Sequence, residues 1–141
     1  MHILRTAVAA LIAAAALAGP ALADSQGDLA GIGGVWRNPK NSVHVRISPC
    51  GDSACGVVVW ASPKAQADAR KGGTESLVGP QLFRNFAPQK AGVWRGKVFV
   101  PDLNMTLTGI AEPRGADALR ARGCLLGSVL CKSQVWVRID G

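Results

Sequence analysis

The sequence predicts an all-β fold, a small antiparallel up-and-down β-barrel of about eight strands. Hydrophobic and polar residues alternate along several short segments, and helical periodicity does not recur. These segments follow one another at a spacing of roughly ten residues, with polar turns between them. Such a pattern is typical of an antiparallel meander that closes as a barrel or folds as a sandwich, and the hairpin-like spacing favours up-and-down connection.

The N-terminal region has the features of a secretory signal peptide, assigned to residues 1–23. A basic residue precedes an apolar run over 7–19, and the small-x-small pattern of 21–23 is a cleavage site. The apolar run is too short to span a bilayer comfortably, so cleavage is favoured over an uncleaved anchor. Residues 24–33 then form a flexible linker and 34–141 a single barrel domain. We expect a periplasmic or secreted protein.

Each strand follows from a local pattern. The segments with such a pattern, in chain order, are 43–47, 56–60, 77–86, 93–100, 105–110, 118–123 and 134–139. The first hairpin is formed by 43–47, in which His44 and Arg46 alternate with Val and Ile, and by the β-branched run 56–60. Gly79-Pro80 indicates a bulge or an edge in the next strand. In the last strand, three aliphatic residues alternate with Trp136 and Arg138.

Residues 61–76 interrupt the strand pattern. They contain no aromatic residue and one β-branched residue, Thr74. One or two helical turns over 65–70 and a flexible loop are both compatible with this composition, and Gly72-Gly73 would end a helix. As the longest irregular connection, this segment is a candidate lid.

The four cysteines are expected to form disulfides, because an exported protein meets an oxidising environment. Three connectivities are possible for Cys50, Cys55, Cys124 and Cys131. The spacing favours Cys50–Cys55 and Cys124–Cys131, although a long-range pair such as Cys50–Cys124 would form if the two loops were neighbours. A zinc site is disfavoured because the spacings C-x4-C and C-x6-C are loose for zinc ligands, so we expect no metal.

A series of short motifs runs in order through nearly the whole chain after residue 33. They are Gly34-Val35-Trp36, Val45-Arg46-Ile47, Cys55-Gly56, Trp94-Arg95-Gly96-Lys97-Val98, Met105-Thr106-Leu107-Thr108-Gly109, Leu119-Arg120-Ala121-Arg122-Gly123-Cys124 and Gln134-Val135-Trp136-Val137-Arg138. Together they resemble the exported bacterial family catalogued as domain of unknown function 2147. The resemblance implies a lipocalin-like barrel and no established activity. The chain departs from the family in 61–76, where Asp68 is not followed by the usual Asn-Pro pair.

The lipocalin likeness implies a structural contact between the two ends of the domain. Lipocalins begin with Gly-x-Trp, and a basic residue near the last strand covers the Trp. Here Trp36 and Arg138 occupy these positions. A guanidinium over an indole contributes about 0.5–2 kcal/mol. The simpler alternative is a core Trp and a surface Arg.

The aromatic residues indicate where a ligand pocket would lie. The candidate pocket residues are Trp60, Phe83, Trp94 and Phe99, because pockets need large apolar side chains. The alternative is that all aromatic residues pack in the core. The cations Arg95, Lys97, Arg120 and Arg122 either point to solvent or anchor a ligand carboxylate.

Composition and motifs exclude several function classes. The net charge is +7, or 15 − 9 = +6 without residues 1–23, but the longest later basic run is Arg70-Lys71. Nucleic acid is therefore not an expected partner, whereas an anionic envelope surface remains possible. No nucleophile elbow, paired carboxylates or phosphate loop is present, and no nucleophile accompanies His44. We expect neither an enzyme nor a cofactor.

Two hypotheses remain. The first is an exported, lipocalin-like binder of a small apolar or amphipathic ligand. The second is a pocketless envelope interaction module that uses its basic surface or the 61–76 loop. Oligomeric state is not predicted.

Overall fold

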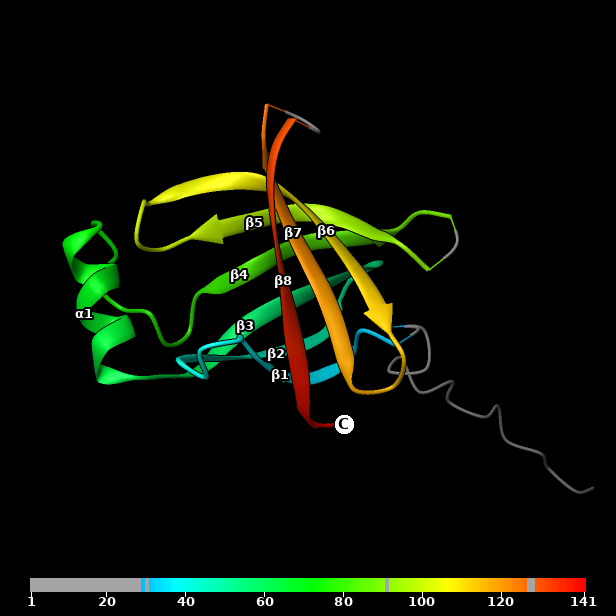
Figure 1. Ribbon diagram of the computed structural model, residues 1–141, viewed down its shortest axis with the longest axis horizontal. Coiled ribbons are helices and arrows are strands. Elements are labelled where there is room, and N and C mark those ends of the chain that lie inside the picture. The colour runs from blue at the N-terminus through cyan, green and yellow to red at the C-terminus, as the bar shows by residue number, and fades with distance from the viewer. Residues whose placement is uncertain (1–28, 30, 91, 127–128) are drawn as a thin grey trace, which may run out of the picture.

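The computed structural model describes residue 29 and residues 31–90, 92–126 and 129–141. Within this part of the chain, eight antiparallel strands close into a barrel (Figure 1). Each strand pairs with its neighbours in sequence, and the last strand pairs with the first. The predicted all-β, up-and-down barrel is therefore confirmed. The predicted signal peptide, 1–23, lies outside the described residues.

The strands agree with those expected from the sequence and extend most of them by a few residues. Their bounds are β1 Gly34–Arg37, β2 Val43–Cys50, β3 Ser53–Ala61, β4 Gln81–Pro88, β5 Trp94–Val100, β6 Met105–Arg114, β7 Ala118–Leu125 and β8 Val129–Asp140. Segment 77–86 is shifted rather than extended, because β4 begins only after Gly79-Pro80.

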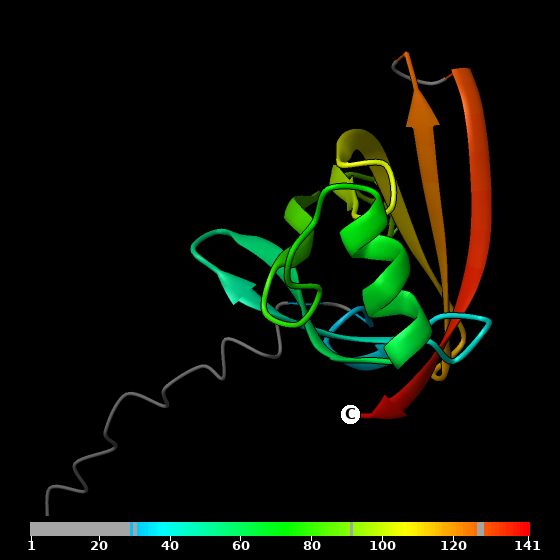
Figure 2. The ribbon, with the colours of Figure 1, turned by 90° about the vertical axis from the view of Figure 1, so that its left-hand side faces the viewer.

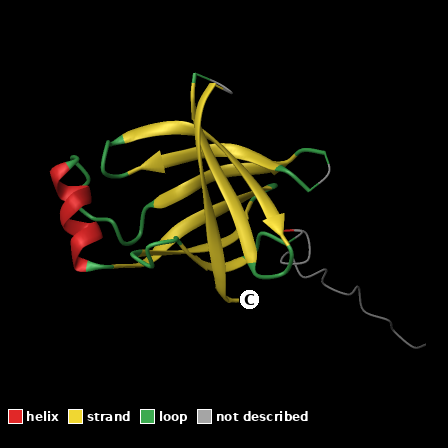
Figure 3. Ribbon diagram, in the orientation of Figure 1, coloured by secondary structure: helices red, strands yellow, loops and turns green. Residues whose placement is uncertain are grey.

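The connection between β3 and β4 contains the helix α1, Pro63–Lys71, shown in red in Figure 3. The Ser62 hydroxyl caps the helix by accepting a hydrogen bond from the Ala65 N–H at 3.1 Å, and Pro63 suits the first turn. Lys64 and Asp68 pair one turn apart at 2.6 Å. The chain leaves the helix at Gly72. Of the two conformations left open for 61–76, the helix is the one adopted.

Up-and-down order gives the barrel two distinct ends. We call the end with α1 and the β1–β2, β5–β6 and β7–β8 connections the mouth, and the opposite end the base. Figure 2 shows that the β7–β8 hairpin rises well clear of the other connections. The mouth therefore has one long projecting hairpin, whose tip lies away from α1 in both views.

Aromatic rings fill much of the barrel interior. Phe83 and Phe86 both point inward although they are three residues apart, because Asn85 has a positive φ of 52° and breaks the alternation. Glycines make room for these rings: a Cβ on Gly56 would lie 2.6 Å from Phe83 Cδ2, and one on Gly96 would lie 2.7 Å from Phe86 Cδ2. Such close packing leaves little free volume in the middle of the barrel.

The described part of the predicted 24–33 linker is packed into the fold. Leu29 and Ile32 are 5% and 1% exposed. The Trp36 indole N–H donates to the Ile32 carbonyl at 2.9 Å. These residues close the base of the barrel. The described part of this segment is therefore packed, whereas the sequence predicts a flexible linker. The apolar character of Leu29 and Ile32 accounts for the difference, because burying them removes their side chains from water.

Both disulfides are local. Cys50–Cys55 closes the β2–β3 turn at the base, and Cys124–Cys131 joins β7 to β8 below the hairpin tip. The long-range alternative is not formed. Among the described residues, no helix is long and apolar enough to cross a bilayer. The same residues contain no group of three or more His, Cys, Asp or Glu placed to hold a metal ion.

Candidate functional site

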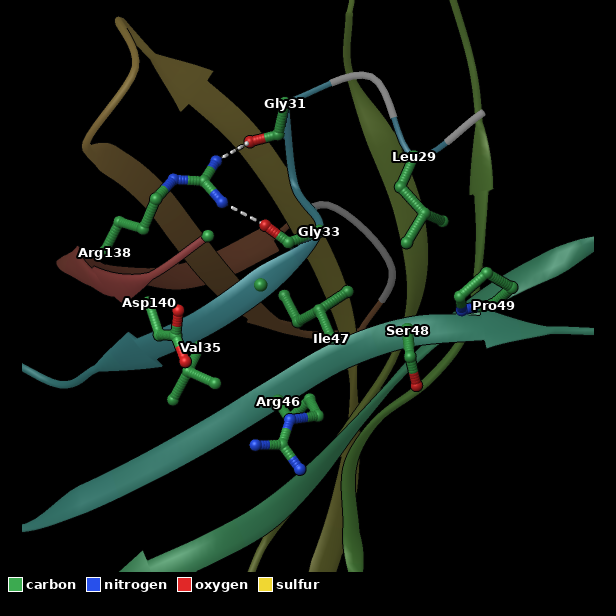
Figure 4. A pocket seen from close by; sticks show the side chains of 12 residues that line it. Leu29, Gly31, Gly33, Val35, Arg46, Ile47, Ser48, Pro49, Arg138 and Asp140 are labelled. Atoms are coloured by element: carbon green, nitrogen blue, oxygen red, sulfur yellow. Dashed lines mark hydrogen bonds between the residues drawn. The ribbon is translucent and has the colours of Figure 1, made fainter. Parts of the chain in front are cut away.

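The base of the barrel is closed by Arg138. Its guanidinium lies 4.2 Å from the centre of the Trp36 ring. It also donates to the carbonyls of Ala116 at 2.8 Å, Gly31 at 2.9 Å and Gly33. Figure 4 shows the side chain reaching from β8 to the segment that precedes β1. The contacts with Trp36, Gly31 and Gly33 join the two ends of the domain, and the contact with Ala116 joins β8 to the β6–β7 turn, so the role of Arg138 is structural.

A cavity of about 320 Å³ lies beside this contact (Figure 4). Its walls include Arg46, Ile47 and Asp140, together with several glycines of the chain entering β1. Arg138, one of the two cations in the lining, already donates to three carbonyls. We call this the base cavity. The Arg138 guanidinium is therefore not free to anchor a ligand in it.

A second cavity, of about 390 Å³, lies at the mouth. We call it the mouth cavity. It is enclosed by α1, the β1–β2 connection, the segment before β4, the β5–β6 turn and β8. Its lining residues are Asn38, Pro39, Lys40, Ser42, Val43, Ser62, Lys64, Ala65, Asp68, Leu77, Leu82, Val100, Pro101, Asp102, Gln134 and Trp136. The volume is at the lower end of the roughly 300–1,000 Å³ of small-molecule sites, which occur in the mouths of β-barrels.

The apolar part of the mouth cavity is formed by strand residues next to the core. Leu82 and Trp136 are 7% and 6% exposed, and Val43 and Val100 are half-buried. The Trp136 ring packs edge-on against Phe83 at 5.5 Å between centroids. This contact fixes the position of the indole.

The indole N–H of Trp136 is buried and has no hydrogen-bond partner among the described residues. A buried donor without an acceptor costs about 1–3 kcal/mol. Most buried polar groups in folded proteins are paired, so an unpaired one requires an explanation. A ligand oxygen that reached this N–H would supply the missing acceptor.

The rim of the mouth cavity carries charges of both signs. Lys64 and Asp68 are joined by a hydrogen bond, which raises the pKa of the Lys64 ammonium and lowers the pKa of the Asp68 carboxyl. Both groups are therefore charged near neutral pH and largely offset each other. Lys40 and Asp102 complete the charged rim. A polar group of a ligand would remain near water here.

The helix that covers the mouth cavity is attached at both ends. At its start, the Ser62 N–H donates to the Ser42 carbonyl at 2.8 Å. At its end, the Thr74 hydroxyl donates to the Pro101 carbonyl at 2.9 Å, and Gly72 lies so close to Asp102 that a Cβ would not fit. The candidate lid 61–76 therefore forms a fixed roof in this structure.

The four pocket residues predicted from the sequence are not brought together. Phe83 and Trp94 are buried in the barrel interior, at 7% and 3% exposure. Trp60 is 42% exposed and stacks on His44 outside the barrel. Phe99 shares a strand face with Arg95 and Lys97, and its ring packs under the Arg84 guanidinium at 4.7 Å. None of the four lines the mouth or base cavity.

The cations weighed as ligand anchors lie on the outer face of the barrel. Arg120 and Arg122 alternate with Leu119, which is fully buried, and share a face with Cys124 and Cys131. Lys97 and Arg95 are exposed and alternate with the buried Trp94. The residues that line the mouth cavity were not predicted from the sequence, because they combine polar residues of the connections and α1 with a few aliphatic residues near strand ends.

Comparison with known proteins gives a family and no assigned activity. The model of the family described as "Uncharacterized protein conserved in bacteria (DUF2147)" matches residues 34–138. No curated protein and no solved structure matches the chain.

Proposed function

The chain belongs to the DUF2147 family of uncharacterized bacterial proteins, and we propose that it is an exported, lipocalin-like binder that holds a small apolar or amphipathic ligand in the mouth cavity. Its two disulfides suit an oxidising compartment, which supports export. The family match itself assigns no ligand.

The mouth cavity carries the proposal. A binder needs an apolar cavity with a few polar groups that orient the ligand. Aromatic rings pack the barrel interior up to Trp136, and the mouth cavity opens above this residue, beneath α1. The ligand would lay its apolar part against Leu82, Val100 and Trp136, and its polar part would face the rim.

The unpaired Trp136 N–H narrows the ligand class. It is a neutral donor, so it favours a ligand with an oxygen acceptor beside its apolar part, such as a carbonyl, ether or carboxylate. The balanced charges of Lys64 and Asp68 give no strong preference for an anion or a cation. A small amphipathic ligand with an oxygen acceptor fits both observations.

The test uses a substitution that fills the cavity. Ala65 lies on the cavity side of α1, so Ala65→Trp should abolish binding of an apolar probe such as 1-anilinonaphthalene-8-sulfonate, measured by calorimetry on delipidated protein. Ala67→Trp makes the same substitution on the same helix but away from the cavity, and should keep the affinity of the parent protein.

Native mass spectrometry of protein purified from its own compartment would identify the natural ligand. A bound amphipathic molecule that is present in the parent protein and missing from Ala65→Trp would support the proposal. Equal probe binding by the parent protein and Ala65→Trp, with both folded by circular dichroism, would contradict it.

A further inference from the structure

We propose that the mouth end docks on an anionic membrane surface by inserting the apolar tip of the β7–β8 hairpin. The tip is formed by Leu125, Leu126, Val129 and Leu130, and we call it the β7–β8 tip. The proposal concerns the outside of the barrel and does not depend on whether the mouth cavity holds a ligand.

Exposed hydrophobic side chains are concentrated at the mouth end. The large exposed hydrophobic residues are Val59, Trp60, Val78, Leu103, Met105, Leu125, Leu126, Val129, Leu130, Val135 and Ile139. All but Val135 and Ile139 lie in or next to mouth connections. The most exposed is Leu126, at 81%, followed by Leu130 at 67%. Scattered exposed apolar residues are ordinary, but the four of the β7–β8 tip lie together in one hairpin, and such a cluster marks an interaction surface.

The backbone of the tip has an unusual conformation for leucine. Leu126 and Leu130 have positive φ angles of 50° and 56°. Residues with a side chain avoid this region, and Gly or Asn normally occupy it. The two leucines therefore stabilise neither the backbone conformation of the tip nor the barrel core. The Cys124–Cys131 disulfide crosslinks the hairpin directly beneath. Contacts between these two leucines and a partner outside the molecule explain why they are kept at positive φ and why the hairpin beneath them is crosslinked.

The charges behind the tip are all positive. Residues 118–139 carry Arg120, Arg122, Lys132 and Arg138, and no Asp or Glu. Lys132 pairs with Gly123, and Arg122 lies one residue further down β7. At about 3.4 Å per residue, these two levels are roughly 10–14 Å behind Leu126. Neither Lys132 nor Arg122 is in an ion pair within the described chain.

This arrangement matches a bilayer surface better than other partners. Peripheral proteins bury apolar side chains about 5–10 Å deep, and cations behind them contact anionic headgroups. Long Lys and Arg side chains can extend toward those headgroups. A second copy of the chain would instead bring like charges such as Lys132 and Arg122 together, which opposes association.

The main test replaces the leucines by a residue that suits their backbone. Leu126→Asn with Leu130→Asn should lower binding to phosphatidylcholine–phosphatidylglycerol vesicles at least about tenfold, measured by cosedimentation of the full mature chain. Because Asn tolerates positive φ, the variant should melt no lower than the parent. The matched control, Val135→Thr with Ile139→Thr, removes two exposed aliphatic residues from the outer face of β8 and should bind as the parent does.

A second variant tests how the positive charges behind the tip contribute to vesicle binding. Arg122→Gln with Lys132→Gln should weaken binding to vesicles that contain phosphatidylglycerol and remove much of the salt dependence, without changing the weak binding to pure phosphatidylcholine. Absence of parent binding to either vesicle, or full binding by the double Asn variant, would overturn the proposal. So would a parent dimer that the double Asn variant dissociates, because the tip would then join two copies. Ala65→Trp should keep vesicle binding, which separates this proposal from the cavity.

Discussion

The base and the mouth of the barrel use the same residue type in opposite ways. At the base, Trp36 is fully buried, its N–H donates to the Ile32 carbonyl, and Arg138 covers its ring. At the mouth, Trp136 is almost as buried, but its N–H has no partner among the described residues and its ring borders a cavity. The buried N–H of Trp36 thus has a hydrogen-bond acceptor, and that of Trp136 has none among the described residues.

We interpret this difference as a division between a structural end and the end that we propose binds a ligand. The contacts at the base all increase the stability of the folded chain. The mouth combines an unpaired donor with exposed leucines at positive φ, and each of these lowers stability. Departures of this kind concentrate where a protein meets its ligands or partners. Predictions that change one end at a time can test this division.

The largest effect is expected at the base, from Arg138→Ala. The substitution removes the contact with the Trp36 ring and three hydrogen bonds to carbonyls, and should lower the free energy of unfolding by about 2–4 kcal/mol. Urea denaturation measures this change. Arg138→Lys should recover little of it, because an ammonium cannot reproduce the planar guanidinium fork.

Arg114→Ala is the matched control for this prediction. Arg114 is exposed, and its pairing with Glu112 at 3.7 Å is a surface contact, so the change should stay within about 0.5 kcal/mol. A loss for Arg138→Ala as small as this would mean that the base contact contributes nothing, and the proposed division between the ends would fail.

A smaller effect is expected from comparing Trp36→Phe with Trp136→Phe. Both substitutions remove an indole N–H from a buried ring. Trp36→Phe also removes a hydrogen bond, whereas Trp136→Phe removes a donor that has no partner, so its loss of stability should be smaller by about 1–2 kcal/mol. Equal losses in urea denaturation would show that the Trp136 N–H is satisfied in solution. Trp136→Phe should also weaken binding of an oxygen-bearing ligand in the mouth cavity.

The sequence predicted the barrel well because its signals are local. Alternation over 43–47 and 118–123 and the turns between strands specify an antiparallel meander without long-range information. Close cysteine spacing likewise favoured the two local disulfides. Gly34-Val35-Trp36 and Arg138 added the one long-range contact, through the family resemblance, and the structure contains it.

The candidate site was harder to predict because it depends on which strand face points inward. In β8, three aliphatic residues alternate with Trp136 and Arg138, and composition alone favours burying the aliphatic face. The structure does the reverse: Trp136 is 6% exposed, and Val135 is 50% exposed. Arg138 must face inward to reach Trp36, and Trp136 is two residues earlier on the same face. The expected Trp36–Arg138 contact thus implied the orientation of β8, and this signal could have identified Trp136, which was not among the predicted pocket residues.

The smallest effect concerns pH and the outer wall of the mouth, where His44 stacks on Trp60 at 4.5 Å. Burial, and secondarily the charge of Arg37, lowers the pKa of His44 below its ordinary value. The folded state then binds a proton less readily than the unfolded state, so stability is complete above about pH 6.5 and falls as the pH drops through that value toward the folded pKa. NMR titration of the His44 ring should give a pKa below 6.5, and His44→Gln should remove the small fall in melting temperature over the same window. A pKa at or above 6.5 would contradict the prediction and indicate that the ring is as hydrated as in an unfolded chain.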